Sequence, residues 1–118
     1  MDYDLEERLL AYAAQMICLT DELPPTRAGV HVAGQLLRSG TSAFAVHGEA
    51  QGAESRKDFV HKLSIGLKEL KESRRWLRLI VKAGMITPAS RVIPVLEETE
   101  ELVRIFAASI RTARGPDK

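Results

Sequence analysis

The first residues to consider are those whose side chains could bind a metal ion or act as nucleophiles. His47 and Glu49 have the His-x-Glu spacing of zinc deaminases, but the chain has no Pro-Cys-x-x-Cys partner, and its single cysteine, Cys18, cannot supply two thiolates. Asp58 and His61 are the nearest match to the Glu-x-x-His pairs of di-metal helical bundles, and His61 falls on a basic outer face. We therefore expect no metal site and no cofactor.

Other catalytic motifs are also missing from the sequence. It contains no phosphate-binding glycine loop, no Gly-x-Ser-x-Gly elbow and no Cys-His arrangement at a recognisable spacing. We expect His31 and His47 to be helix-surface or interface residues, and Cys18 to be a small hydrophobic residue of the core. The sequence thus predicts a protein that is not an enzyme and has no catalytic residues.

A basic segment gives the clearest candidate for a binding surface. Residues 56–82 hold nine bases and three acids, a net charge of +6, whereas residues 1–26 hold six acids and one base, a net charge of −5. On a helix, most of these basic side chains fall within an arc of about 100°, opposite an apolar stripe. We call this set the basic ridge; it consists of Lys57, Lys68, Lys71, Arg75, Arg78 and Lys82.

Three interpretations of the basic ridge are open at this point. It could be a solvated outer face, as on many bundle helices. It could instead bind the phosphates of RNA or DNA, and phosphate contacts of this kind carry no base specificity. In the third interpretation it pairs with the acidic N-terminal helix of a neighbouring copy, and assembly would then be sensitive to salt.

An apolar flank on the same segment predicts an oligomer contact. We call it the interface strip; it consists of Ile65, Trp76 and Leu79. Tryptophan is enriched at interfaces, so we expect the strip to contact another copy or a partner protein. The alternative is a wider core in which Trp76 covers one edge of the bundle. Glu69 and Glu72 flank the strip and are expected to accept a hydrogen bond from Trp76 or to pair with Lys68 and Arg75.

These side chains must be positioned by helices, because no useful run of alternating polar and apolar residues predicts a strand. Breaks at Pro24-Pro25, at residues 52–55 and at residues 84–88 divide the chain into four segments with apolar residues at steps of three and four. The prediction is a single all-α domain over residues 1–118, an antiparallel up-down-up-down four-helix bundle. Its helices are expected at about 4–20, 27–52, 56–83 and 88–112.

The pattern also predicts which residues enter the core and where helices end. In the second helix we expect an inner stripe of Val30, Ala33, Leu37, Thr41 and Phe44, and a close helix contact at the small residues between 39 and 52. In the third helix the expected stripe runs from Phe59 to Leu77. Ser55 and Asp58 predict an N-terminal cap for that helix, and Pro94 predicts either a later start or a kink in the fourth.

Composition adds limits on the class of protein. The chain of 118 residues has 45% hydrophobic and 28% charged residues, a composition that excludes an intrinsically disordered protein. Its net charge of +1 excludes a strong electrostatic field of one sign over the whole protein. The acidic start is unlike a signal peptide, and no apolar run reaches the roughly 18 residues that a membrane span needs. With a lone cysteine as well, we expect a cytoplasmic protein that does not contact membranes.

Two segments carry a resemblance to a known family. They are QLLRSGTSAFAVHGEA at residues 35–50 and ESRKDFVHKLSIGLKE at residues 54–69, followed by Trp76-Leu77. The chain resembles a bacterial family of four-helix-bundle proteins that includes the proteins encoded in intervening sequences of large-subunit ribosomal RNA genes. It is also similar to the accessory variability determinant of diversity-generating retroelements. The likeness runs from the first helix to Ile86, and SRKDF leading into KLSIGLKEL is not explained by bundle periodicity alone.

The resemblance implies a ring-like homopentamer with a basic surface that meets nucleic acid. Two departures, Phe44 in place of a small residue and Val46 in place of asparagine, put any function of that asparagine in doubt and suggest different packing of the second helix. The residues that match the family pattern are Arg38, Ser42, Glu49, Ser55, Arg56, Asp58, Phe59, Lys62, Glu69 and Trp76.

Together, these observations predict a non-enzymatic oligomeric bundle, a pentamer by resemblance, whose basic ridge binds RNA or DNA backbone. The alternative is a protein-interaction scaffold without nucleic-acid binding, in which the ridge and the interface strip serve subunit or partner contacts.

Overall fold

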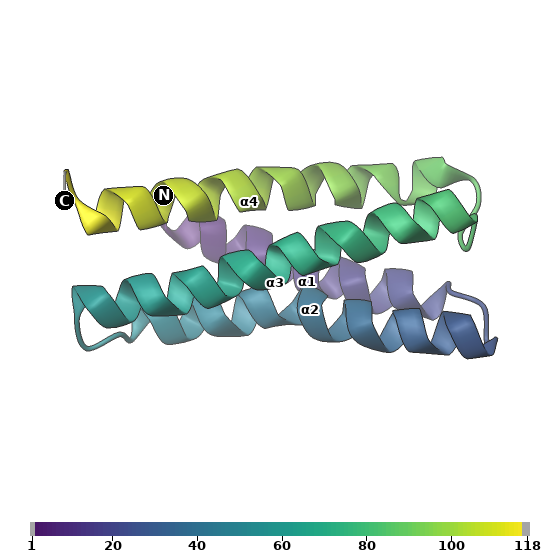
Figure 1. Ribbon diagram of the computed structural model, residues 1–118, viewed down its shortest axis with the longest axis horizontal. Helices are drawn as coiled ribbons and strands as arrows, with labels where there is room; N and C mark the ends of the chain where they lie inside the picture. The colour runs from purple at the N-terminus through teal and green to yellow at the C-terminus, as the bar shows by residue number, and fades with distance from the viewer. Residues whose placement is uncertain (1, 117–118) are drawn as a thin grey trace.

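The computed structural model describes residues 2–116, which form four long helices and no strand. The helices are α1 (Asp2–Asp21), α2 (Arg27–Gln51), α3 (Arg56–Ala83) and α4 (Ile93–Arg114), with a short 3₁₀ turn, η1 (Ala89–Arg91), before α4. Successive helices run in opposite directions along a bundle 46 Å long (Figure 1). The predicted all-α, antiparallel four-helix architecture is thus confirmed.

The predicted helix ends are largely correct. The Ser55 hydroxyl accepts a hydrogen bond from the Asp58 N–H at 3.0 Å, so the predicted cap of α3 is present. Gly84 ends α3 with a φ of +66°, the left-handed conformation that favours glycine. The fourth helix begins at Ile93 and not near residue 88, because the chain first makes the turn η1. Pro94 then occupies the first turn of α4, where its missing N–H has no helical partner to lose.

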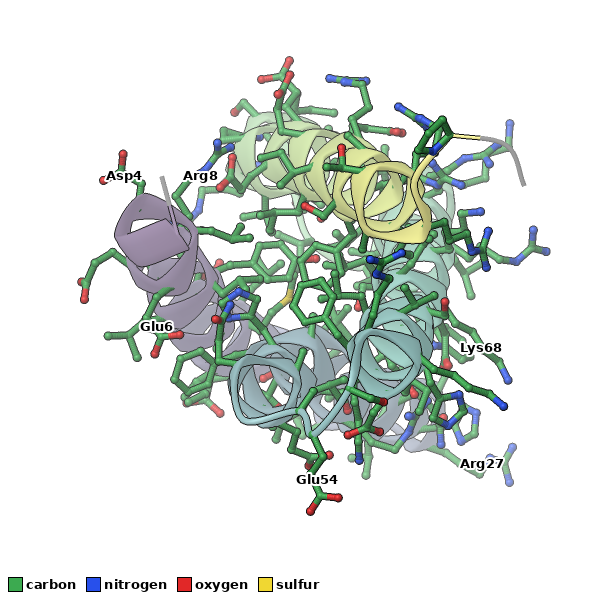
Figure 2. The ribbon with its side chains drawn as sticks, turned by 90° about the vertical axis from the view of Figure 1, so that its left-hand side faces the viewer. Asp4, Glu6, Arg8, Arg27, Glu54 and Lys68 are labelled. Atoms are coloured by element: carbon green, nitrogen blue, oxygen red, sulfur yellow. The ribbon has the colours of Figure 1, made fainter. Side chains whose placement is uncertain are left out.

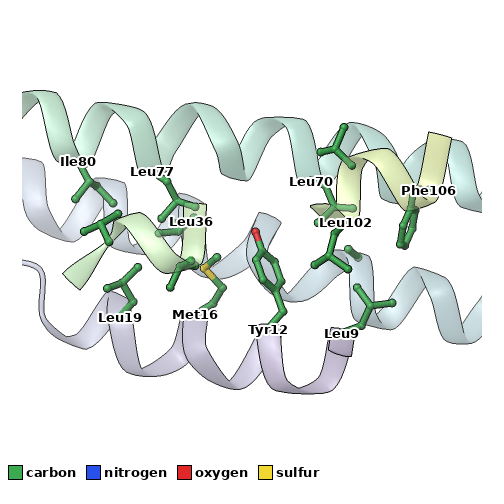
Figure 3. Packing of buried hydrophobic residues seen from close by; sticks show 14 of the residues in the cluster. Leu9, Tyr12, Met16, Leu19, Leu36, Leu70, Leu77, Ile80, Leu102 and Phe106 are labelled. Atoms are coloured by element: carbon green, nitrogen blue, oxygen red, sulfur yellow. The ribbon is translucent and has the colours of Figure 1, made fainter. Parts of the chain in front are cut away.

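The core is a continuous apolar column between the four helices (Figure 3). From α1 it takes Leu9, Met16 and Leu19, and from α4 Leu102 and Phe106, all buried. The stripe predicted for α3 is confirmed, although Phe59 at its start is only half-buried.

The core face predicted for α2 is wrong. Val30 is 63% exposed and Leu37 39% exposed, while Leu36, Ser39 and Ala43 are fully buried. The side of α2 with small residues faces the core because small side chains let the neighbouring helices approach closely. The predicted close contact of this segment is therefore confirmed, and the predicted stripe lies on the outer edge that faces α1.

Two glycines mark the closest helix approaches. A Cβ atom on Gly40 would lie 2.5 Å from Cγ of Met16 in α1, and a Cβ atom on Gly66 would lie 2.6 Å from Cε2 of Phe106 in α4. Real Cβ atoms do not come this near to another carbon atom, so each site requires the absence of a side chain. Gly66 belongs to the KLSIGLKEL segment, and its role is to admit the ring of Phe106.

The alanine variants of two glycines are expected to differ in sign. Gly66→Ala should lower the free energy of unfolding by about 1–3 kcal/mol because the methyl group overpacks against Phe106. Gly34→Ala is the matched control: a Cβ atom at this position would point into open space, with no neighbouring side chain within 4 Å, and alanine should stabilise the helix by about 0.5–1 kcal/mol. Urea unfolding followed by circular dichroism measures both. Equal stabilisation by the two substitutions would contradict this packing.

A layer of buried hydroxyl groups crosses the middle of the core, with one from each helix. The Ser39 and Ser73 oxygens lie 2.8 Å apart, and the Tyr12 and Thr99 oxygens lie 2.7 Å apart. The Thr99 hydroxyl donates to the Val95 carbonyl oxygen at 2.8 Å, so the Tyr12 hydroxyl donates to Thr99. Burial raises the pKa of Tyr12 to about 12, against smaller lowering effects from the Thr99 and Ser73 hydroxyl groups.

This hydroxyl layer ties together α1 and α4, which pack less closely than the other pairs of neighbouring helices. Near it, Arg8 makes two hydrogen bonds to the Glu98 carboxylate, at 2.7 and 3.0 Å, and this pairing raises the pKa of Arg8. If one helix were shifted along its neighbours, these buried hydroxyl groups would lose their hydrogen-bond partners, which costs free energy. The layer therefore favours one alignment of the four helices.

Candidate nucleic-acid interface

The basic ridge lies along the outer face of α3, opposite the core. All six of its side chains are exposed, and Lys68 points away from the bundle in the end-on view (Figure 2). The ridge extends over about 38 Å of helix, at 1.5 Å per residue from Lys57 to Lys82. The predicted placement of these residues on one exposed face is thus what the structure shows.

The other two long cationic side chains near the middle of α3 behave differently from the ridge. Lys62 donates to Glu49 of α2 at 2.9 Å, and Arg74 donates to Glu100 of α4 at 3.1 Å. Among the described residues, none of the six ridge side chains has a carboxylate oxygen within 4 Å. The cations of α3 that face α2 and α4 are therefore neutralised by carboxylates of those helices, whereas the cations on its outer face are available to a ligand.

The seam between α2 and α3 is held by ion pairs that the sequence did not predict. Arg38 of α2 donates to Glu69 at 3.0 Å and also pairs with Glu72. Hydrogen bonds from Arg38, and secondarily from the Trp76 indole, lower the pKa of Glu72. The predicted pairing of Glu69 and Glu72 with Lys68 and Arg75 is wrong, because both carboxylates face α2 and not the outer face of α3.

Trp76 occupies the same seam, and its environment fits parts of both sequence interpretations. Its indole N–H donates to Glu72 at 3.0 Å, as predicted, and its ring meets the exposed His31 ring edge-on with centroids 6.0 Å apart. The ring is half-buried against the core, as a residue that covers a bundle edge should be. Ile65 is also half-buried, whereas Leu79 is 44% exposed.

A shallow groove adjoins the interface strip at the C-terminal half of α3. Its apolar lining comes from Trp76, Leu79, Val81 and, across the seam with α4, Leu96. Its basic lining comes from three ridge residues, Arg75, Arg78 and Lys82. The ridge and the strip, predicted as separate features, therefore meet in one groove.

Two expectations for single residues are wrong. Cys18 is exposed and not a core residue, because it lies on the outer side of α1, away from the buried row of Tyr12, Met16 and Leu19. His47 is buried and not on the surface: it contacts Phe106 with ring centroids 6.2 Å apart, and its Nε2 lies 3.0 Å from the Gln51 side-chain nitrogen. Its Nδ1 lies 3.4 Å from a carboxylate oxygen of Glu6 and, within the described part of the chain, makes no hydrogen bond.

In the residues that the structure describes, no three His, Cys, Asp or Glu side chains are grouped as metal ligands. None of the described helices is long and apolar enough to cross a membrane.

Comparison with known proteins decides the family. The family model of the 23S rRNA-intervening sequence proteins matches residues 2–108. The chain belongs to this family. Among solved structures, it is similar to a protein of unknown function from the S23 ribosomal protein family of Bacteroides thetaiotaomicron, with 31% identity and a TM-score of 0.83 over 90% of this chain and 97% of that chain. A search of the curated proteins gives no significant match.

Membership of the 23S rRNA-intervening sequence proteins confirms the resemblance seen in the sequence, and the structure explains several of its residues. Arg38 pairs with Glu69, Glu49 pairs with Lys62, and Ser55 caps α3. These motif residues therefore hold the α2–α3 hairpin together. The two departures lie on the same helix: Phe44 is half-buried on the edge facing α1, and Val46 is half-buried as well.

Proposed function

We propose that this member of the 23S rRNA-intervening sequence proteins is a non-enzymatic, oligomeric bundle of the cytoplasm that binds the phosphate backbone of RNA or DNA through the basic ridge. The observation that carries the proposal is the division of cations on α3. Lys62 and Arg74 are neutralised by carboxylates, and the six ridge residues are not.

The chemistry of the ridge favours a linear polyanion. Its lysine and arginine side chains are spread along one helix face, a pattern suited to successive phosphates and not to one compact anion. Binding would release condensed counterions from the nucleic acid, which supplies affinity without base contacts. The family resemblance implies a basic surface that meets nucleic acid, and this supports a nucleic acid over other polyanions.

The oligomeric part of the proposal is a homopentamer, as the family resemblance implies. Leu79 and the groove beside it are exposed apolar surface that an assembly would cover. Several copies would also bring several ridges onto one nucleic acid, which raises the overall affinity without any new contact.

Reversal of charge in the middle of the ridge tests the binding proposal. Lys68→Glu/Arg75→Glu should weaken binding of a 30-nucleotide single strand at least tenfold, because two attractive phosphate contacts become repulsive. The matched control is Arg104→Glu/Arg111→Glu, which places the same charge change at the same spacing of seven residues on exposed positions of α4. Fluorescence anisotropy at about 50 mM salt measures both. Equal affinities of the two variants would contradict the proposal.

A protein-interaction scaffold is the second candidate, and the exposed apolar surface at Leu79 is the observation that favours it. In that case the strip and the ridge would both serve protein contacts. The same anisotropy experiment separates the candidates, since a scaffold would bind the oligonucleotide no better than an unrelated neutral protein.

A further inference from the structure

A second exposed apolar surface lies on the opposite side of α2 from the interface strip. We call it the α1–α2 stripe; it consists of Leu10, Ile17, Val30 and Leu37. These four side chains are 46%, 53%, 63% and 39% exposed, and they account for most of the large exposed apolar side chains in the described part of the chain. Such a surface on one face calls for a partner.

Helix geometry places these four residues along one seam. Leu10 and Ile17 belong to the row of α1 that starts at Glu6, whose carboxylate lies 3.4 Å from His47 of α2. Val30 and Leu37 belong to the row of α2 that includes Gly40, which meets Met16 of α1. The two rows therefore face each other, and their exposed members form one stripe along the α1–α2 edge.

The interface strip lies along the other edge of α2. The row of α3 that contains Ile65, Trp76 and Leu79 also contains Lys62 and Glu69, which pair with Glu49 and Arg38 of α2. The end-on view shows α1, α2, α3 and α4 following one another around the bundle (Figure 2). The stripe and the strip are thus on neighbouring sides of the molecule, with α2 at the corner between them.

The charges around these two apolar surfaces are opposite in sign. The exposed carboxylates of Glu6, Glu7 and Asp21 lie on α1 near the stripe. Arg75, Arg78 and Lys82 line the groove at the strip together with one carboxylate, Glu72, which pairs with Arg38, so the charge of the groove is positive on balance. Two stripes brought together would place like charges opposite each other, whereas a stripe and a strip would place opposite charges around an apolar centre.

From this complementarity we infer that the α1–α2 stripe of one copy docks on the interface strip and groove of the next copy. The inference rests on the proposed oligomer and names its two contact surfaces. The contact is head-to-tail, because two different surfaces meet. Because the two surfaces lie on neighbouring sides of the bundle, each copy turns relative to the one before it, and such a contact can close into a ring. The ridge residues Lys57, Lys68 and Lys71 lie outside the groove and stay open to nucleic acid.

The test uses two full-length variants, each with one damaged surface. Leu10→Glu/Ile17→Glu places carboxylates on the stripe, and Leu79→Glu places one on the strip. All three positions are exposed, so both variants should fold, which circular dichroism verifies. Ile93→Glu is the control, since Ile93 is 37% exposed and belongs to neither surface. Masses are measured by light scattering after nuclease treatment, so that the result does not depend on nucleic-acid binding.

The wild type and Ile93→Glu should have the mass of a closed ring, and each surface variant alone should be a monomer. An equimolar mixture of the two surface variants should form a dimer of one copy of each. Each variant then contributes its intact surface to one contact, while the damaged surfaces cannot extend the chain. A mixture that stays monomeric, a surface variant that keeps the wild-type mass, or a monomeric wild type would overturn the inference. None of these outcomes bears on whether the ridge binds phosphate.

Discussion

Raising the pH from 10 to 12 is expected to lower the free energy of unfolding of the wild type by about 2 kcal/mol more than that of a Tyr12→Phe variant. The cause is the buried Tyr12 hydroxyl, which donates to Thr99 and whose pKa is raised from 10.0 to about 12. Each pH unit between the two pKa values corresponds to about 1.4 kcal/mol.

The sign follows from proton binding. Above pH 10 the unfolded chain loses the Tyr12 proton while the folded chain keeps it, so the folded state binds more protons and stability falls with pH. Below pH 10 both states hold the proton, and this group gives no pH dependence. The loss is complete once the pH exceeds about 12, the pKa in the folded protein.

Urea unfolding at several alkaline pH values, with Tyr12→Phe as the reference, measures this effect. The variant retains every other group that titrates in this range, so the difference between the two curves isolates Tyr12. Curves that fall in parallel would mean that the hydroxyl is not buried in the layer with Thr99, and the register of α1 against α4 would need revision.

The sequence was sufficient to predict the helices because local signals agreed with one another. Ser55 capped α3 as predicted, Gly84 ended it, and the apolar steps of three and four on α1, α3 and α4 pointed to the core. Pro94 predicted a later start or a kink in the fourth helix, and α4 does start later than the predicted range.

The second helix was predicted poorly because two of its faces are apolar. The row with Val30 and Leu37 has larger side chains, so periodicity favoured it as the core face. Burial instead follows Leu36, Ser39 and Ala43, because the small side chains of Ser39 and Ala43 let the neighbouring helices approach closely on this face. The row with Val30 and Leu37 stays exposed because the other face of α2 fills the core. This exposed apolar row is the observation from which the α1–α2 stripe is inferred.

The candidate site was predicted in position but not in its pairings. Helical projection was enough to place the ridge on an exposed face of α3. It could not predict that Arg38, thirty-one residues before Glu69, would bind Glu69 and Glu72, because that contact depends on how α2 packs against α3. The groove that joins ridge and strip depends on Leu96 of α4 in the same way.

Salt should act strongly on nucleic-acid binding if six ridge cations contact phosphates. These are the six of one free copy or, in the ring, Lys57, Lys68 and Lys71 of two neighbouring copies. For a single strand, the slope of log affinity against log salt concentration is then about −4. Affinity should therefore fall roughly 300-fold between about 50 and 200 mM salt. In Lys68→Glu/Arg75→Glu the slope should be shallower by more than about 1, since two of the six contacts are lost.

The central claim, that the unpaired cations on α3 bind a phosphate backbone, is tested most directly by this salt titration. The measurement is the affinity of the wild type and of Lys68→Glu/Arg75→Glu for one fluorescent single-stranded oligonucleotide at a series of salt concentrations. We predict a slope near −4 for the wild type and a clearly shallower one for the variant. A wild-type slope near zero, or the same slope in both proteins, would contradict the account.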